Sequence, residues 1–203
     1  MRRPSRFRPL SAVGLLTPFL LLACIPDGDP DDSTADAGLD GGLLADGGTD
    51  TDAGTVELSQ FARDMLEAHN AARAAAKPTP SPALEPLTWD PAVAEVAQKW
   101  ADNCVFEHNP NRGNAGENIA WSSPGYWDTK GVVKAWVDEV ADYDYAKNTC
   151  KTGAQCGHYT QVVWRNTRRL GCAMQRCTKS GSTSDFYVCN YAPPGNYVGQ
   201  RPY

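Results

Sequence analysis

Residues 156–164 read CGHYTQVVW, and residues 186–197 read FYVCNYAPPGNY. The apolar and aromatic start of the second stretch predicts a strand over residues 186–191, and residues 170–177 predict another. The polar residues 178–185 between them predict a connecting loop. We therefore expect a hairpin late in the chain, with His158 shortly before it.

Three segments before this hairpin have the apolar periodicity of helices. They cover residues 55–76, residues 90–104 and residues 129–140. The second segment starts with Asp-Pro, which places a capping carboxylate before a proline at the first helical position. Helices come first and strands gather late, so the pattern favours an α+β fold over alternating βαβ units.

The amino-terminal residues predict export. Residues 1–23 combine four arginines with a short apolar run, which is typical of a secretory signal peptide. The run ends in LLAC, which resembles a bacterial lipobox, so we expect Cys24 to carry a lipid that anchors the protein to a membrane. The alternative is an ordinary secreted protein. Either way the protein is expected outside the cytoplasm, in the cell envelope (outer membrane or cell surface) or in the medium.

The charge of the chain is uneven. Residues 1–55 hold four of the 19 Lys and Arg and nine of the 24 Asp and Glu, which leaves 15 of each sign in residues 56–203. Residues 24–55 are rich in Asp and Gly and predict a disordered tether. Residues 56–203 form the expected folded domain, whose neutral balance argues against nucleic-acid binding. No apolar run reaches the length of a membrane-spanning helix.

The cysteines predict a disulfide-stapled domain. One of the seven is Cys24, and the other six are Cys104, Cys150, Cys156, Cys172, Cys177 and Cys189. Six cysteines in an exported domain imply three disulfides, with fifteen possible connectivities. The absence of a CxxC pair argues against zinc-ribbon and thioredoxin sites.

Histidines and acidic residues supply the candidate chemistry. His69 lies at the edge of a helical stripe and is interpreted as a hydrogen-bonded packing residue. His108, Glu117, Glu139 and His158 stand at positions expected to be partly buried, where two imidazoles and carboxylates would suit zinc or another divalent metal. There is no HExxH helix and no nucleophile elbow, so standard metalloprotease and serine hydrolase sites lack support.

Four blocks of the domain resemble the CAP superfamily: cysteine-rich secretory proteins, antigen five and plant pathogenesis-related group one. In chain order they are His69–Arg73, Gly116–Ala120, Gly157–Trp164 and Phe186–Tyr197. The likeness covers residues 56–203 and is closest to the plant group, which the ending at residues 199–203 also resembles. The lipobox and tether lie outside it and point to a bacterial member.

The resemblance implies a three-layer α-β-α sandwich with a central antiparallel sheet. It implies a cleft that holds a tetrad of His108, Glu117, Glu139 and His158. It also implies disulfides that join Cys104 to Cys172, Cys150 to Cys156 and Cys177 to Cys189.

Two functions remain open from the sequence. The first is a non-enzymatic binding module for a lipid, a sterol-like small molecule or a metal, with Trp121, Tyr126, Trp127 and Tyr143 as candidate groove residues. The alternative is a metal-dependent hydrolase or protease, in which His108 and His158 hold a metal-bound water and Glu117 is the base. The sequence identifies no protein partner, and it does not decide whether the chain is an enzyme.

Overall fold

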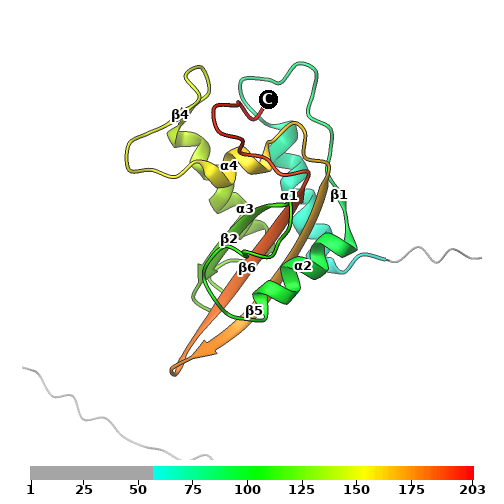
Figure 1. Ribbon diagram of the computed structural model, residues 1–203, viewed down its shortest axis with the longest axis vertical. Helices are drawn as coiled ribbons and strands as arrows, with labels where there is room; N and C mark the ends of the chain where they lie inside the picture. The colour runs from blue at the N-terminus through cyan, green and yellow to red at the C-terminus, as the bar shows by residue number, and fades with distance from the viewer. Residues whose placement is uncertain (1–56) are drawn as a thin grey trace, which may run out of the picture. The chain divides into compact units, whose positions relative to one another are not determined.

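A four-stranded sheet in the order β1-β5-β6-β2 is the centre of the computed structural model, which describes residues 57–203 (Figure 1). The long strands β5 (Arg169–Lys179) and β6 (Ser182–Ala192) form an antiparallel hairpin, and β2 (Gly116–Ser122) runs antiparallel to β6. The short strand β1 (Thr88–Trp89) pairs with β5 in parallel, so the sheet is antiparallel apart from this edge. The expected signal peptide, the lipidated Cys24 and the tether lie outside the described residues.

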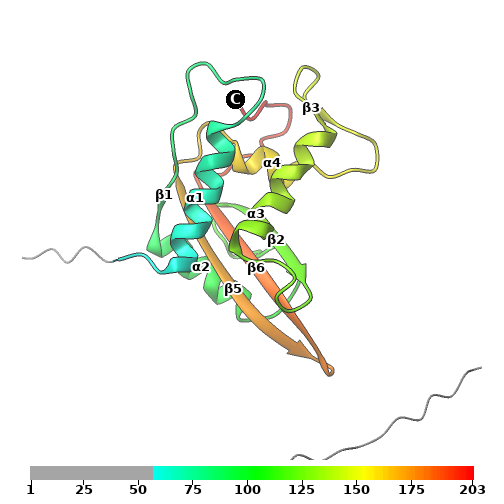
Figure 2. The same ribbon diagram turned by 180° about the vertical axis from the view of Figure 1, so that it is seen from behind.

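Helices cover both faces of the sheet. Helix α2 (Pro91–Ala101) lies on one face, whereas α1 (Gln60–Ala74), α3 (Thr129–Asp138) and α4 (Gly157–Val162) lie on the other (Figures 1 and 2). The predicted three-layer α+β sandwich is therefore confirmed. None of the helices in residues 57–203 combines the length and the apolar character that crossing a membrane requires.

Smaller elements connect the layers. Helix α3 continues into the 3-10 turn η1 (Glu139–Asp142), and a two-stranded sheet of β3 (Tyr143–Asp144) and β4 (Thr149–Cys150) precedes α4. Helix α4 itself has only six residues, and its sequence gave no helical period from which to predict it.

A separate apolar core lies on each face of the sheet. On the α2 face, Ala97 and Ala101 pack against Phe186 and Val188 of β6. On the opposite face the core is larger, and its buried members include Met65, Val132, Trp136, Leu170, Tyr187 and Tyr191. Alternate residues of β6 thus enter different cores, as expected for a strand buried on both sides.

The helix starts follow local capping signals. The Asp90 carboxylate accepts hydrogen bonds from the backbone N–H groups of Ala92 and Val93, so the predicted start of α2 is confirmed. The Ser59 hydroxyl caps α1 in the same way, which places the start of that helix at Gln60, five residues after the start of the predicted segment 55–76. The Pro-rich residues after α1 connect this helix to β1.

The hairpin turn is much tighter than predicted. The structure replaces the expected loop over residues 178–185 with a two-residue turn, Ser180–Gly181, whose φ angles are 52° and 80°. Positive φ at both central positions is the turn geometry that matches the twist of paired strands. Most polar residues of the predicted loop belong to the exposed ends of the strands, where the hydroxyls of Thr178 and Thr183 lie 3.1 Å apart, but Asp185 is buried and paired with Arg176.

All six cysteines of the domain are oxidised, but two of the implied pairings are wrong. The disulfides join Cys104 to Cys177, Cys150 to Cys156 and Cys172 to Cys189. Strand register explains the difference, because Cys172 lies directly opposite Cys189 whereas Cys177 lies opposite Ser184. At ~3.3 Å per residue, Cys177 and Cys189 are roughly 16 Å apart along the hairpin, beyond the reach of a disulfide.

Candidate functional site

His108 and Glu117 form the first of two histidine–glutamate pairs. His108 lies in the loop after α2, and Glu117 is the second residue of β2. The imidazole Nδ1 lies 2.8 Å from Glu117 Oε1, which also accepts a hydrogen bond from the backbone N–H of Asn109 at 2.9 Å. The Glu117 side chain is fully buried, whereas 54% of the His108 side chain is exposed. The Nδ1 edge of the imidazole is thus fixed by Glu117, and much of the rest of the side chain is exposed to solvent.

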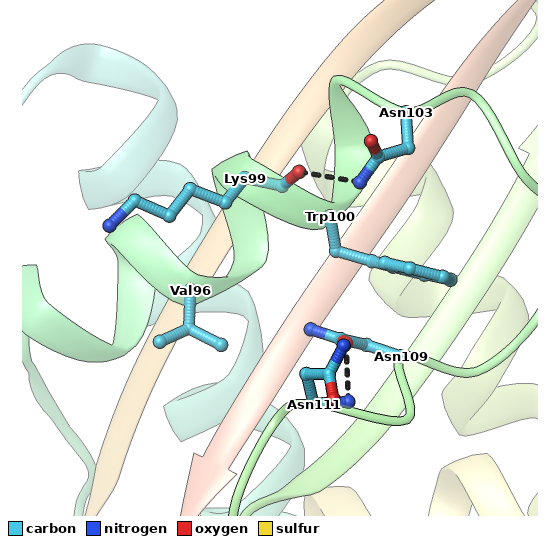
Figure 3. Close-up of a pocket in the computed structure, with 6 residues that line it drawn as sticks. All are labelled: Val96, Lys99, Trp100, Asn103, Asn109 and Asn111. Atoms are coloured by element: carbon cyan, nitrogen blue, oxygen red, sulfur yellow. Dashed lines mark hydrogen bonds between the residues drawn. The ribbon is translucent and has the colours of Figure 1, made fainter.

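A cavity of about 240 Å³ lies between α2 and the loop that follows His108 (Figure 3). Val96 and Trp100 of α2 form one side of the cavity, and Asn109 and Asn111 of the following loop form the other. Asn109 links the cavity to the pair, because its backbone N–H is bonded to Glu117.

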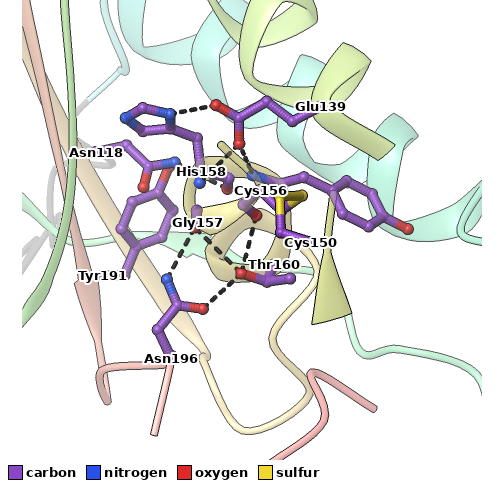
Figure 4. A network of polar contacts seen from close by, with 10 residues as sticks. Asn118, Glu139, Cys150, Cys156, Gly157, His158, Thr160, Tyr191 and Asn196 are labelled. Atoms are coloured by element: carbon purple, nitrogen blue, oxygen red, sulfur yellow. Dashed lines mark hydrogen bonds and ion pairs between the residues drawn. A yellow bond between two sulfur atoms is a disulfide. The ribbon is translucent and has the colours of Figure 1, made fainter. Parts of the chain in front are cut away.

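His158 and Glu139 form the second pair (Figure 4). Glu139 Oε1 lies 2.5 Å from Nδ1 of His158, and Oε2 accepts hydrogen bonds from the backbone N–H groups of His158 and Tyr159. The first N–H groups of a helix have no partner within it, and Cys156 at the N-cap of α4 offers none. Glu139 therefore caps α4 from outside and holds the imidazole with the same carboxylate.

A chain of buried hydrogen bonds that starts at the sheet supports the His158–Glu139 pair. Asn118 Nδ2 donates to the backbone carbonyl of His158 and to the hydroxyl of Tyr191. Tyr191 in turn bonds Nε2 of His69, whose Nδ1 donates to the Met65 carbonyl. Burial lowers the pKa of His69 to about 4 and raises the pKa of Tyr191, so both stay neutral at pH 7. The prediction that His69 is a hydrogen-bonded packing residue is confirmed.

The two pairs are linked through neighbouring residues of β2. Glu117 and Asn118 are consecutive residues of this strand, so their side chains point to opposite faces of the sheet. Glu117 holds His108 on the α2 side, and Asn118 contacts the His158 backbone on the α4 side. The four predicted tetrad residues are thus brought together as two pairs joined through one strand.

The arrangement does not match a single four-ligand metal centre. Within residues 57–203, no three His, Cys, Asp or Glu side chains lie close enough together to hold an ion. Both carboxylates are already bonded to the Nδ1 atom of their own histidine. The tetrad atoms without a hydrogen-bond partner among the described residues are the two imidazole Nε2 atoms and the buried Oε2 of Glu117.

The four aromatic residues expected to line a ligand groove do not meet. Trp121 packs against Phe186 on the α2 face, with ring centroids 5.5 Å apart. Trp127 packs on the core of the opposite face and contacts the exposed Tyr126. Tyr143 packs beside α4. Trp121 lies on one face of the sheet and Trp127 on the other, whereas Tyr143 lies beside α4. The four residues therefore do not form one groove.

Sequence reasoning missed several residues that shape the site. The Trp136 ring stacks on the His158 imidazole with an interplanar angle of 21°. The buried Arg73 guanidinium donates to the carbonyls of Val162 and Trp164 and fixes the end of α4, and burial lowers its pKa to about 10. Arg73 is the last residue of the motif block His69–Arg73, and its place in that block was the only signal of its role in the sequence.

Comparison with known proteins agrees with the fold and the disulfide-bonded domain. Residues 66–191 match the model of the CAP, or cysteine-rich secretory protein, family. Pathogenesis-related protein 1A of Nicotiana tabacum is 46% identical over 145 residues, which cover 70% of this chain and 80% of the relative.

Solved structures give the same result. The venom allergen-like protein 4 of Schistosoma mansoni superimposes with a TM-score of 0.60 at 29% identity, over 72% of this chain and 95% of that protein. The structure of NaASP2 with Zn2+ superimposes with a TM-score of 0.57 at 31% identity, over 71% and 86%. The chain therefore belongs to the cysteine-rich secretory protein family and is similar in sequence to plant pathogenesis-related proteins of group one.

Proposed function

We propose that the chain is an exported, non-enzymatic binding module whose histidine–glutamate pairs bind a divalent transition metal ion. The observation that carries the proposal is common to both pairs. In each, the glutamate carboxylate is hydrogen-bonded to Nδ1 of the histidine, and Nε2 of that histidine has no partner in the described domain. A carboxylate behind an imidazole is the usual outer partner of a metal-bound histidine, because it fixes the tautomer and the ring orientation. Zinc is the ion expected for neutral imidazole ligands.

The number of protein ligands sets the strength of such a site. Because each carboxylate is bonded to its own histidine and the remaining Oε2 of Glu117 is buried, the ligands nearest to solvent are the two imidazole nitrogens, and water would complete the coordination. We therefore expect weak, exchangeable binding rather than a structural zinc site. The relative NaASP2, solved with Zn2+, supports this choice of ion.

The geometry favours binding over hydrolysis. In residues 57–203 neither tetrad imidazole is hydrogen-bonded to a serine, threonine or cysteine side chain, and all six cysteines are in disulfides. No activated nucleophile is therefore formed. Glu117, the expected base of the hydrolase alternative, is buried against His108 on the side of β2 opposite the His158 contact. It is poorly placed to serve a water molecule at His158.

A lipid or sterol-like ligand is not part of the proposal. The residues expected to line its groove, Trp121, Tyr126, Trp127 and Tyr143, do not form one cluster, although Tyr126 and Trp127 contact each other.

Zinc titration by isothermal calorimetry tests the proposal on the full chain and on the variants His108→Gln and His158→Gln. We expect saturable Zn²⁺ binding that weakens at least ten-fold in each variant. If one ion is shared, each variant removes all binding, whereas two independent ions would leave half of the stoichiometry. Unchanged binding in both variants would refute the proposal. Ca²⁺ serves as the control, since it selects oxygen ligands such as the Asp-rich residues 25–55 and should not respond to either change.

We further propose that Cys24 anchors the domain to the cell envelope through a lipid. The LLAC sequence supports the anchor, and the three disulfides support a location where thiols are oxidised. In a bacterial host, metabolic labelling with an alkyne-palmitate analogue should tag the full chain and not Cys24→Ser. The variant should also leave the membrane fraction. Equal labelling and fractionation of both proteins would show that the protein is simply secreted.

A further inference from the structure

A second cavity on the α2 side of the sheet contains a buried amide that the functional site does not use. The cavity measures about 240 Å³, and Ala92, Val93 and Val96 of α2 form its apolar wall. Asn190 of β6 also lines it and is completely buried. Neither Nδ2 nor Oδ1 of this side chain has a hydrogen-bond partner in the described domain.

Packing alone does not explain an asparagine at this position. Asn190 lies between Gly171 of β5 and Glu117 of β2 in the sheet register. Helix α2 rests directly on Gly171, where a Cβ atom would lie 2.1 Å from the backbone nitrogen of Ala94. A leucine would fill the volume of Asn190 without burying an unpaired amide, which costs free energy in an apolar site. The Asn190 amide therefore needs a hydrogen-bond partner that comes from outside the chain and enters the cavity.

Two arginines and one aspartate lie at the cavity rim. Arg169 is paired with Asp90 at 2.5 Å, and the other carboxylate oxygen of Asp90 caps α2. Arg112 keeps its charge and donates to the backbone carbonyls of Ala115 and Asn109. The rim thus offers no free carboxylate to a cation, and the neutral donor–acceptor pair of Asn190 favours a neutral occupant over an anion.

We propose that this cavity binds a small neutral molecule that carries a carboxamide or a similar donor–acceptor pair on a short apolar chain. A carboxamide satisfies both the donor and the acceptor of the Asn190 side chain at once. The pairing holds for either orientation of the Asn190 amide, so it does not depend on how nitrogen and oxygen were assigned. The apolar chain would contact Val93 and Val96. The volume lies below the ~300–1,000 Å³ of drug-sized sites, so the ligand is expected to be small.

Titration of the ¹⁵N-labelled full chain with isobutyramide, followed by NMR, tests the proposal. We expect saturable shifts at the backbone amides of Val93 and Val96 and at the Asn190 side chain. 3-Methyl-2-butanone, which has the same shape but no donor, should bind at least ten-fold more weakly. Sodium isobutyrate tests charge, and tighter binding of this anion than of the amide would overturn the proposal.

Two variants and one control locate the binding. Asn190→Leu removes the amide and should abolish the shifts, and Ala92→Phe should do the same by filling the cavity while Asn190 is kept. Asn103→Leu makes the same change at an exposed position beyond the other end of α2 and should bind as the wild type does. The absence of saturable shifts in the wild type, or their persistence in both cavity variants, would show that Asn190 faces only trapped water. None of these outcomes bears on zinc binding by the histidines.

Discussion

Glu117 and Asn190 lie directly opposite each other on β2 and β6, and both end in buried polar atoms without a partner. In residues 57–203, the only buried side-chain atoms of this kind are Oε2 of Glu117 and the two amide atoms of Asn190. The opposite face of the sheet is different, because Asn118 and Tyr191 there are hydrogen-bonded. The buried side-chain atoms that lack a hydrogen-bond partner in the described domain therefore lie on the face of the sheet that α2 covers.

Two asparagines on neighbouring strands should respond in opposite ways to replacement by leucine. Asn118→Leu should lower the free energy of unfolding by about 2 kcal/mol, because it leaves the His158 carbonyl and the Tyr191 hydroxyl short of a donor. Asn190→Leu should be neutral or stabilise by up to about 1 kcal/mol, since it removes only unpaired groups. Urea unfolding measures both. Equal destabilisation would mean that buried water satisfies Asn190.

The Glu139 carboxylate should contribute strongly to stability because it serves three donors. Glu139→Gln removes its charge and at least one bond to His158 or Tyr159, so we expect a loss of about 2–3 kcal/mol in urea unfolding. Asp138→Asn is the matched control at the neighbouring position. Its exposed pair with Lys134 should contribute less than about 0.5 kcal/mol. Similar losses in the two variants would contradict the capping role of Glu139.

Features set by a few adjacent residues could be predicted from the sequence. The start of α2 follows from Asp90 and Pro91 alone, and the structure places the cap there. The Ser180–Gly181 dipeptide was an equally local signal of a two-residue turn, but the polar residues around it suggested a longer loop.

Features set by strand register and layer packing could not be predicted in this way. Cys172 pairs with Cys189 because the two-residue turn fixes the register of β5 against β6, which no spacing of cysteines reveals. The grouping of His108, Glu117, Glu139 and His158 came from the family resemblance rather than from periodicity, and neither predicted which histidine bonds which glutamate. The unpaired amide of Asn190 became visible only once α2 was placed over the sheet.

The three disulfides should differ in their contribution to stability. In the chain-entropy model a bridge contributes more when it closes a longer loop. Cys104–Cys177 spans 73 residues, so its replacement by two alanines should cost about 4 kcal/mol. Cys172–Cys189 spans 17 residues and should cost about 3 kcal/mol. Denaturant unfolding of the two double variants measures the order, and non-reducing peptide mapping checks the connectivity. A Cys104–Cys172 peptide would contradict the structure.

His69 should make the domain less stable in mild acid. Burial lowers its pKa to about 4 in the folded chain, and its value in the unfolded chain is ~6.5. The unfolded state therefore binds the proton more readily, so stability is complete above pH 6.5 and falls as the pH drops toward 4. The shift of about 2.5 units corresponds to a loss of about 3 kcal/mol.

Comparison of the wild type with His69→Gln isolates this contribution. Glutamine can keep a hydrogen bond to Tyr191 but does not titrate, so the variant should show a smaller decrease in unfolding free energy between pH 7 and pH 4. Urea unfolding at half-unit pH steps provides the measurement, and the other titrating groups are common to both proteins. The variant is expected to be less stable at pH 7, so the slope against pH, rather than the absolute value, is the quantity to compare. Identical slopes would mean that the pKa of His69 is the same in the folded and the unfolded chain, in conflict with its burial and its bond to the Tyr191 hydroxyl.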